Sequence, residues 1–463
     1  MARNPAYRVE HDSMGELQVP ADALWGAQTQ RAIDNFPISG RPMPRGFIRA
    51  LGLIKTAAAD VNAGLGLLPK NRAAAIRKAA LEVADGKHDA HFPIDVFQTG
   101  SGTSSNMNAN EVIATLASRA GTPVHPNDHV NLGQSSNDVI PVAIQVAAAL
   151  LWHEALRPAL VHLRGVVDRR AKELSKVVKT GRTHLMDAMP LTLGQELSAW
   201  SAQLGSAIRR LDDSAARLRR LPLGGTAIGT GINADPRYAK AAVARLRALS
   251  GIKFVQAANL FEGIAAQDAA VEFSGQLNAL AVALTKIAND LRWMNSGPLA
   301  GLGEIELPAL QPGSSIMPGK VNPVIPEVVN QTGFLVIGLD LTVTLAASAG
   351  QLQLNVMEPV ITFALFASIT TMERAVTSLR VNCIEGIKPN ADRTRDMVMN
   401  SLGIVTVLKP SLGYKQCADI AHEGYTTGKS LHDIVVKERK LLTQQKWDEV
   451  FSFENLINPK FEQ

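Results

Sequence analysis

The stretch LTLGQELSAWSAQLGSAIRRLDDSAARLRRL, residues 191–221, carries the pattern that decides the fold. Apolar side chains recur along it every three or four residues, at Leu193, Leu197, Trp200, Leu204, Ile208, Leu211, Ala215 and Leu218. This spacing puts them on one face of a helix, so the stretch predicts one long amphipathic helix. Its charged cluster at 209–220 contains acids at helical spacing and indicates a solvated face, not a nucleic-acid patch.

Similar patterns run through residues 141–177, 265–295, 325–350 and 358–385. These segments are much longer than the usual helix of roughly 11–12 residues. Helices of this length must pack side by side, so we expect an all-α (mainly α) fold with a long central helical bundle. We expect three domains: a mostly helical one at 1–138, the bundle at 139–392 and a small helical one at 393–463. Apolar faces of such a bundle favour a homo-oligomer.

Composition narrows the class of protein. The chain has 463 residues, 46% of them hydrophobic, and can bury a large core. Its net charge of +5 is mild and spread along the chain, which disfavours nucleic acid as a partner. Cys383 and Cys417 lie in no metal-binding or disulfide pattern and suit a reducing cytoplasm. No signal peptide is apparent, and the apolar run at 140–152 is too short to span a membrane.

Four polar segments rich in Ser, Thr, Asn and Gly stand between the apolar runs. They are TGSGTSSNMNANE (99–111), HPNDHVNLGQSSND (125–138), KTGRTHLMDA (179–188) and QPGSSIMPGKVNP (311–323). Any one alone would usually be a helix cap or a turn. Together they favour a site that holds carboxylates by hydrogen bonds, because neutral donors orient an anion without neutralising it fully. The prolines and glycines of the fourth segment predict an irregular loop between helices.

His184 follows Thr183 ahead of the long helix at 191–221. It can be a capping histidine, or a general acid/base because the unperturbed pKa of histidine lies near 6.5. Glu327 lies shortly beyond Lys320 and could face an imidazole, which would raise the basicity of that ring. A single sequence does not show whether the two side chains are in contact.

The segment GSSIMPGKVNP resembles the signature loop of the fumarase/aspartase superfamily, and the other three segments resemble its remaining blocks in the expected order. The resemblance covers essentially the whole chain, from DSMGELQVPADALWGAQTQRA (12–32) to the C-terminal module. LWGAQTQRA, TGSGTSSNMN, GQSSND and GRTHLMDA look most like the versions of class II fumarate hydratases. PVIPEVVNQ (323–331) and GQLQLNVMEPV (350–360) look more like aspartate ammonia-lyase, so ammonia in place of water stays an alternative.

The resemblance implies reversible anti addition of water to fumarate, a tricarboxylic acid cycle reaction that forms (S)-malate and requires no redox cofactor or metal. Ser314 would take the Cβ proton, and His184, oriented by Glu327, would serve the leaving group. An inactive helical scaffold is a third reading. It is disfavoured because Ser314, His184 and Lys320 are all present.

The resemblance also implies a set of substrate contacts: Ser101, Gly102, Thr103, Ser135, Ser136, Asn137, Thr183, Ser315, Lys320, Val321 and Asn322. Lys320 and Asn322 would hold the carboxylate that becomes a dianion. A second anion site would comprise His125, Pro126, Asn127 and Asp128, although a helix start with Pro126 in first position explains that segment equally well. The resemblance further implies a homotetramer whose active sites combine segments of three subunits.

Overall fold

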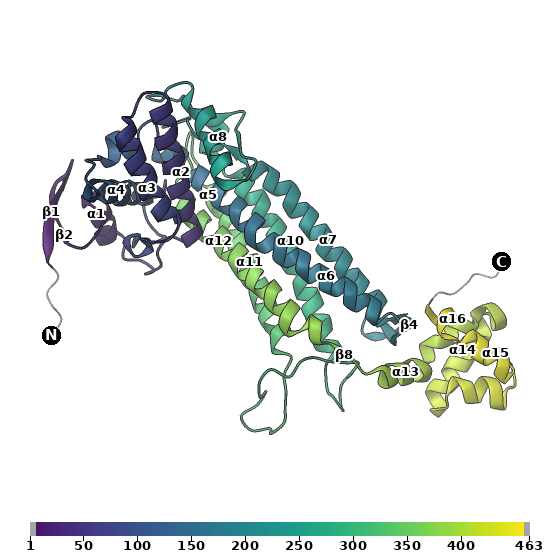
Figure 1. Ribbon diagram of the computed structural model, residues 1–463. Coiled ribbons are helices and arrows are strands. Elements are labelled where there is room, and N and C mark those ends of the chain that lie inside the picture. The colour runs from purple at the N-terminus through teal and green to yellow at the C-terminus, as the bar shows by residue number, and fades with distance from the viewer. Residues whose placement is uncertain (1–5, 458–463) are drawn as a thin grey trace. The chain divides into compact units, whose positions relative to one another are not determined.

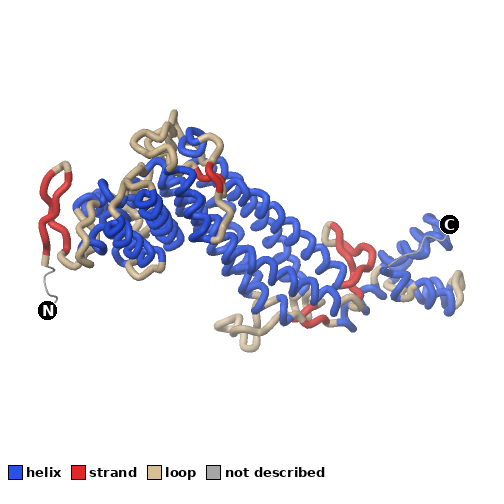
Figure 2. The backbone as a smooth tube through the Cα atoms, turned by 45° about the horizontal axis from the view of Figure 1, so that its top comes forward, coloured by secondary structure: helices blue, strands red, loops and turns tan. Residues whose placement is uncertain are grey.

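The computed structural model describes residues 6–457 and is mainly helical, as the sequence predicts (Figure 1). Strands of the described residues form four two-stranded sheets (Figure 2). The chain divides into two compact units. Unit 1 comprises Met1–Pro158, Ala207–Val282 and Thr332–Arg374, and unit 2 comprises Ala159–Ser206, Ala283–Gln331 and Ala375–Gln463. The division into three domains at 1–138, 139–392 and 393–463 stays a prediction.

Unit 1 starts with an antiparallel hairpin of β1 (Tyr7–Asp12) and β2 (Gly15–Pro20). Shorter helices follow and pack closely, for example α2 on α3 at Gly52, where a Cβ would lie 2.6 Å from the Ala80 carbonyl oxygen. Two short strands pair in parallel, β5 (Arg220–Leu221) and β6 (Val255–Gln256). The shorter helices are α1 (Ala27–Asn35), α2 (Arg45–Gly64), α3 (Lys70–Ala84), η1 (Asp89–His91), α4 (Thr103–Arg119), η2 (Pro126–Val130), α5 (Ser136–Leu151), η3 (Trp152–Leu156), α8 (Tyr238–Ser250) and α9 (Leu260–Ala265).

The predicted long helices are confirmed. All eight apolar positions that define the pattern of residues 191–221 are at most 8% exposed. The periodicity therefore reflects a helix face that is covered along its whole length. The long helices are α7 (Leu193–Leu218), α10 (Asp268–Met294), α11 (Val324–Ser348) and α12 (Glu358–Asn382). Helix α6 (Arg157–Glu173) continues from α5 and η3 as one helical segment of 38 residues, Ser136–Glu173.

Polar contacts join the long helices within unit 1, where α7, α10 and α11 lie side by side (Figures 1 and 2). Arg217 of α7 forms an ion pair with Glu272 of α10. Asp340 of α11 accepts hydrogen bonds from Ser274 and Asn278 of α10 at 2.6 and 2.7 Å. These pairs fix the rotation of each helix about its axis, which apolar packing alone specifies weakly.

Unit 2 contains the antiparallel pairs β3 (Val178–Thr183) with β4 (Met186–Thr192) and β7 (Ile305–Glu306) with β8 (Lys388–Pro389). It ends in a helical module, as predicted, whose own core includes Leu408, Ile420, Ile434 and Trp447. The remaining helices are η4 (Ile384–Gly386), α13 (Ala391–Asn400), η5 (Leu402–Leu408), α14 (Lys409–Thr427), η6 (Asp433–Glu438), α15 (Gln444–Val450) and α16 (Phe453–Ile457).

Three helical segments are long and apolar enough to cross a membrane, by length and composition alone: Ser136–Glu173, Val324–Ser348 and Glu358–Gly386. The expectation that the run at 140–152 is too short is therefore wrong. The helical segment continues through Pro141, which lies inside α5 and has no N–H to donate to the Asn137 carbonyl. In the most apolar 18 residues of each segment, the buried share is 78%, 33% and 56%, respectively.

Candidate active site

Five predicted substrate contacts lie at the N-terminal ends of two helices in unit 1. We call them the hydroxyl cradle: Ser101, Thr103, Ser135, Ser136 and Asn137. The hydroxyl oxygens of Ser101 and Thr103 lie 2.9 Å apart just before and at the start of α4. Ser135 caps α5, and its hydroxyl accepts a hydrogen bond from the Asn137 N–H at 3.2 Å. Helix N-termini favour anions, so the cradle suits a carboxylate.

The two helix ends meet at Gly102, another predicted contact. Its φ of 68° lies in the left-handed region, and a Cβ there would lie 2.8 Å from Cγ2 of Ile140. Glycine is therefore required on both conformational and steric grounds. Asn106 of α4 donates a hydrogen bond to Ser136 Oγ of α5 at 3.0 Å. Within unit 1 the cradle is thus held together by direct contacts.

A buried cation lies behind the cradle. Lys55 of α2 is 0% exposed, and its ammonium group donates to Asn106, Asn131 and Gln134 at 2.8–3.0 Å. Burial lowers the pKa of Lys55 to about 7, and the Asp138 carboxylate partly opposes that shift. Sequence analysis missed Lys55, and a lone lysine within the apolar stretch ALGLIKTAAADV (50–61) was the available signal.

Ser314 lies in residues 311–323 of unit 2, which form a loop without helix or strand, as predicted. Its hydroxyl oxygen accepts hydrogen bonds from the backbone N–H groups of Ile316 and Met317 at 3.2 and 3.0 Å. Two such donors stabilise negative charge on the oxygen and therefore favour loss of its proton.

The loop closes on itself around Gly313. The Gly313 N–H donates to the Lys320 carbonyl at 2.7 Å, and the Asn322 amide donates to the Gly313 carbonyl at 2.7 Å. A Cβ at position 313 would lie 2.8 Å from both Asn322 N and Lys320 O. One N–H of Asn322, a predicted substrate donor, is therefore used within the loop.

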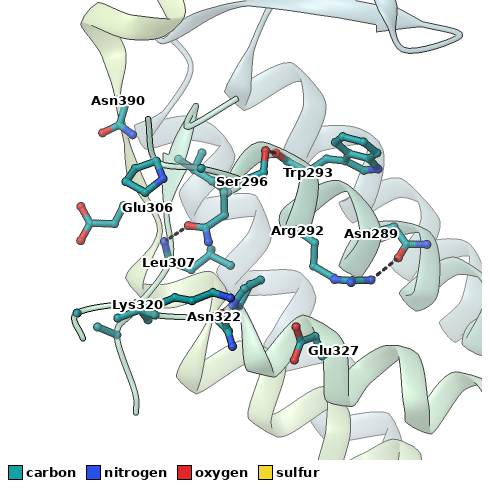
Figure 3. A pocket seen from close by; sticks show the side chains of 18 residues that line it. Asn289, Arg292, Trp293, Ser296, Glu306, Leu307, Lys320, Asn322, Glu327 and Asn390 are labelled. Atoms are coloured by element: carbon teal, nitrogen blue, oxygen red, sulfur yellow. Dashed lines mark hydrogen bonds between the residues drawn. The ribbon is translucent and has the colours of Figure 1, made fainter. Parts of the chain in front are cut away.

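Four predicted residues line one cavity of about 890 Å³ in unit 2: Lys320, Val321, Asn322 and Glu327. Figure 3 shows that Arg292 of α10 also lines it, a cation that sequence analysis did not single out. Its closest polar partner drawn there is the Asn289 side chain, at 3.5 Å. The cavity wall thus carries the two cations Arg292 and Lys320 together with the carboxylates of Glu306 and Glu327.

Thr183 and His184 lie at the tip of the β3–β4 hairpin in unit 2, where both are exposed. His184 and Leu185 form its turn with φ values of 55° and 61°. Positive φ at both central positions defines a type I′ turn, which is unfavourable for non-glycine residues. Sequence analysis placed His184 directly ahead of a long helix, but strand β4 intervenes before α7 begins at Leu193.

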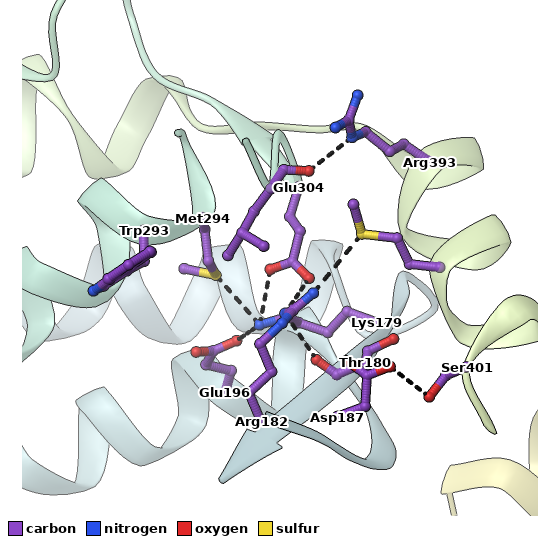
Figure 4. A network of polar contacts seen from close by, with 12 residues as sticks. Lys179, Thr180, Arg182, Asp187, Glu196, Trp293, Met294, Glu304, Arg393 and Ser401 are labelled. Carbon is purple, nitrogen blue, oxygen red and sulfur yellow. Dashed lines mark hydrogen bonds and ion pairs between the residues drawn. The ribbon is translucent and has the colours of Figure 1, made fainter. Parts of the chain in front are cut away.

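Buried ion pairs hold the base of this hairpin (Figure 4). Lys179 Nζ lies 2.6 Å from Glu196 Oε2 and 3.1 Å from Glu304 Oε2, while Arg182 Nη1 lies 2.6 Å from Glu304 Oε1. Glu304 is 0% exposed. Loss of one member of such a buried network leaves an uncompensated charge, so the network supports the strained turn at His184.

The predicted site residues are divided between the units. Unit 1 contains the hydroxyl cradle, Gly102 and residues 125–128, and unit 2 contains the others: Thr183, His184, Ser314, Ser315, Lys320, Val321, Asn322 and Glu327. Within the described part of unit 2, no hydrogen bond or ion pair joins His184 to Glu327. The pairing of these two side chains stays a prediction.

The segment HPND forms a helix start. His125 is the N-cap of η2, its Nδ1 accepts from the Asp128 N–H at 3.1 Å, and Pro126 occupies the first turn. This confirms the structural reading of the segment, and its use as an anion site stays a prediction. Across residues 6–457, this segment included, no group of three or more His, Cys, Asp or Glu side chains could hold a metal ion.

Comparisons with known proteins agree with this geometry. A family model described as "Lyase" matches residues 15–338, and one described as "Fumarase C C-terminus" matches residues 404–458. A class II fumarate hydratase of Xylella fastidiosa is 61% identical and one of Mycobacterium tuberculosis is 50% identical, covering 95% and 93% of this chain and 93% and 91% of the relatives.

Solved structures show the same similarity. A class II fumarase from Schistosoma mansoni is 37% identical with a TM-score of 0.94, and the match covers 98% of this chain and 100% of that one. A fumarate lyase:delta crystallin from Brucella melitensis, bound to cobalt, is 45% identical with a TM-score of 0.93, covering 97% and 99%.

The chain therefore belongs to the fumarase/aspartase superfamily of lyases. Within it, the chain is a hydro-lyase of the class II fumarate hydratase type, and its reaction is the reversible hydration of fumarate to (S)-malate. The alternative of aspartate ammonia-lyase is not favoured, because the hydratases at 50% and 61% identity match more than nine-tenths of the chain.

Proposed function

We propose that Ser314 removes the Cβ proton of malate in the dehydration direction. The observation that carries this proposal is the pair of backbone N–H groups on its hydroxyl oxygen, at 3.0 and 3.2 Å. A free hydroxyl is far too weak a base for a carbon acid, and donors that stabilise the alkoxide reduce that deficit. The electron pair of the broken C–H bond moves onto the adjacent carboxylate, which becomes an aci-carboxylate dianion.

Lys320 and Asn322 bind this developing dianion. Both line the cavity of unit 2, where Lys320 supplies a positive charge and Asn322 a neutral donor. The bond from Asn322 to the Gly313 carbonyl fixes the orientation of the amide. Val321 lies between them in the chain and also lines the cavity.

The hydroxyl cradle binds the other carboxylate together with Ser315. Hydroxyl groups at helix N-termini orient an anion by hydrogen bonds without adding a full charge. Gly102 permits the close approach of the two helix ends, and Asn137 and Thr183 complete the polar surroundings. Removal of one such donor typically lowers the rate on the order of 10²–10³-fold.

His184 serves the leaving group, as general acid in dehydration and as general base toward water in hydration. In hydration it takes a proton from water while the water oxygen bonds to one fumarate carbon, and Ser314 returns its proton to the other carbon. Glu327 orients the imidazole. Because the two side chains share no contact within one described chain, we propose that they meet across subunits.

We propose that the active protein is a homotetramer with shared active sites. Helix α11 supports this assembly, since Phe334, Leu341 and Leu345 on it are 62%, 59% and 62% exposed. These positions are spaced by seven and four residues and therefore lie on one face. An apolar stripe of this kind marks an interaction surface on a soluble protein.

We further propose that the protein works in the cytoplasm, in the tricarboxylic acid cycle, with a small dicarboxylate as its substrate and without nucleic-acid or membrane partners. The two cysteines are both buried and unpaired, which suits a reducing compartment. Residues 125–128 are proposed as a second anion site, separate from the cradle.

Deuterium exchange at the malate Cβ separates the proposed roles. In deuterated water, Ser314→Ala should lose both fumarate formation and Cβ exchange, because no base remains. His184→Asn should lose fumarate formation but retain exchange, because Ser314 still removes the proton. Ser198→Ala on the exposed side of α7 is the control and should match the wild type. Exchange at the wild-type rate in Ser314→Ala would reject that residue as the base.

A further inference from the structure

A strained segment lies beside the hydroxyl cradle in unit 1. Thr226 has a φ of 55° and is 4% exposed, although a β-branched residue is rarely found in the left-handed region. Its neighbour Gly224 has a φ of 92°, and a Cβ there would lie 2.4 Å from Cβ of Ala239. The segment around Thr226 is therefore wedged against α8 in a conformation that surrounding contacts must enforce.

Asp138 supplies those contacts. This carboxylate is 0% exposed, and one of its oxygens accepts from the N–H groups of Gly224 and Thr226 at 2.9 and 3.0 Å. Its other oxygen accepts from the Ser135 N–H at 2.9 Å, within the cradle. Burial raises the pKa of Asp138 to about 6, while the N–H groups and Lys55 oppose the shift. Asp138 thus clamps the strained segment onto the start of α5.

The clamp determines which atom Asn137 offers to a ligand. The Asn137 Nδ2 donates to the carbonyl of Ala227, the residue after Thr226, at 2.8 Å. Because a carbonyl oxygen accepts only from a donor, this bond fixes the amide with its nitrogen toward Ala227. The Asn137 oxygen is then the amide atom that can accept a hydrogen bond from a ligand.

The Asn137 oxygen, as a hydrogen-bond acceptor, could orient the water that attacks fumarate. The attacking water loses one proton to the general base, and its other O–H needs an acceptor if a lone pair is to point at the fumarate carbon. A neutral amide oxygen can hold that second O–H without removing its proton. A misdirected Asn137 amide would instead offer N–H groups and turn the water away.

We propose that Asp138 is a positioning residue that, through residues 224–227, fixes the Asn137 amide with its oxygen toward the attacking water. This inference rests on the proposed function, specifically on Asn137 as a contact of the bound reactants. It assigns a role in catalysis to a buried carboxylate and to a segment outside the four polar blocks.

A double-mutant cycle on purified full-length protein tests the proposal. Asp138→Asn places an NH₂ group among the N–H donors and should displace the Ala227 carbonyl. We expect it to lower kcat on the order of 10–100-fold, with a smaller change in KM. In the Asn137→Ala background the same substitution should change kcat less than about 2-fold, because the group it positions is gone. Equal losses in both backgrounds, or wild-type kcat in Asp138→Asn, would overturn the proposal.

Two further variants keep the test decisive. Ala227→Gly loosens the same carbonyl without removing a polar group. It replaces Asp138→Asn in the cycle if that variant does not fold, and the same outcomes are expected.

The matched control is Glu111→Gln. Glu111 is another buried carboxylate, and it accepts hydrogen bonds from the backbone N–H groups of Gly26, Gln28 and Thr29 at 2.9–3.2 Å. The substitution should lower stability in both backgrounds but leave kcat unchanged. Failure of the wild type to hydrate fumarate would instead reject the function itself.

Discussion

At the scale of residues, Lys55 shows how burial couples a charge to pH. Its pKa of about 7 lies well below the ordinary value of 10.5 because burial disfavours the ammonium form. At a pH between these two pKa values, Lys55 is mostly protonated in the unfolded chain and mostly neutral in the folded chain. The free energy of unfolding therefore rises with pH in this window. The pKa of Asp138 is raised from 3.8 to about 6. Between these two values the folded chain holds a proton that the unfolded chain has lost, so the free energy of unfolding falls as pH rises.

We expect the thermal midpoint of the wild type to rise more between about pH 7.5 and about pH 9.5 than that of Lys55→Met, because only the wild type carries the buried amine. The variant should be less stable at both pH values, since it takes the Lys55 donor away from the side-chain oxygens of Asn106 and Gln134. Differential scanning calorimetry measures both effects. The exposed Lys240→Met should follow the wild type. Parallel shifts in wild type and Lys55→Met would contradict the assignment of a buried, weakly basic amine.

At the scale of elements, the 311–323 loop and the β3–β4 hairpin carry the two side chains of unit 2 that we propose as catalytic, Ser314 and His184. An irregular loop leaves backbone N–H groups free to point at Ser314 Oγ, whereas a helix would use them internally. The hairpin places His184 in a tight turn backed by the buried Glu304 network. Both elements hold a side chain in a geometry that local sequence preference alone would not maintain.

Gly313→Ala should disrupt the loop while leaving the helices intact. The new Cβ would lie 2.8 Å from Asn322 N and Lys320 O, so the ring that they close must open. We expect kcat to fall on the order of 10²-fold with unchanged circular dichroism. Gly275→Ala in α10 is the matched control, since nothing lies within 4 Å of its added Cβ. A wild-type kcat in Gly313→Ala would show that closure of the loop is dispensable.

Sequence patterns predicted the long helices and the 311–323 loop because periodicity and Pro/Gly content report directly on local conformation. The β3–β4 hairpin was missed because its turn is His184–Leu185, without the Asn-Gly or Gly signal that usually marks a type I′ turn. Lys55 and Arg292 were missed for a different reason. The lone lysine within residues 50–61 was a local sign of Lys55, but its partners are distant in sequence. The place of Arg292 in the cavity wall arises from tertiary packing, which the sequence does not display.

At the scale of the whole molecule, the predicted site residues are divided between two units, with the hydroxyl cradle in unit 1 and the Ser314 loop in unit 2. The proposed assembly of the site from several subunits would account for this division. It would also account for the apolar stripe on α11, which a second copy of the chain would cover.

Subunit mixing tests this assembly. Ser314→Ala should be inactive alone, and Asn137→Ala should keep only a residual activity, on the order of 10²–10³-fold below that of the wild type. When the two variants are unfolded, mixed in equal amounts and refolded, some sites receive an intact cradle from one subunit and an intact loop from another. We expect about a quarter of the wild-type activity from random assembly. Refolded wild type sets the scale, and mixtures that stay inactive would mean that each site lies within one subunit.

The most direct test of the account is whether the purified chain adds water to fumarate. Fumarate absorbs in the ultraviolet and malate does not, so the loss of absorbance in buffer without ammonium reports hydration. We predict rapid loss of absorbance and formation of (S)-malate, with no fumarate formed from L-aspartate. Fumarate that is stable in water but consumed with ammonium, or released from L-aspartate, would contradict the account.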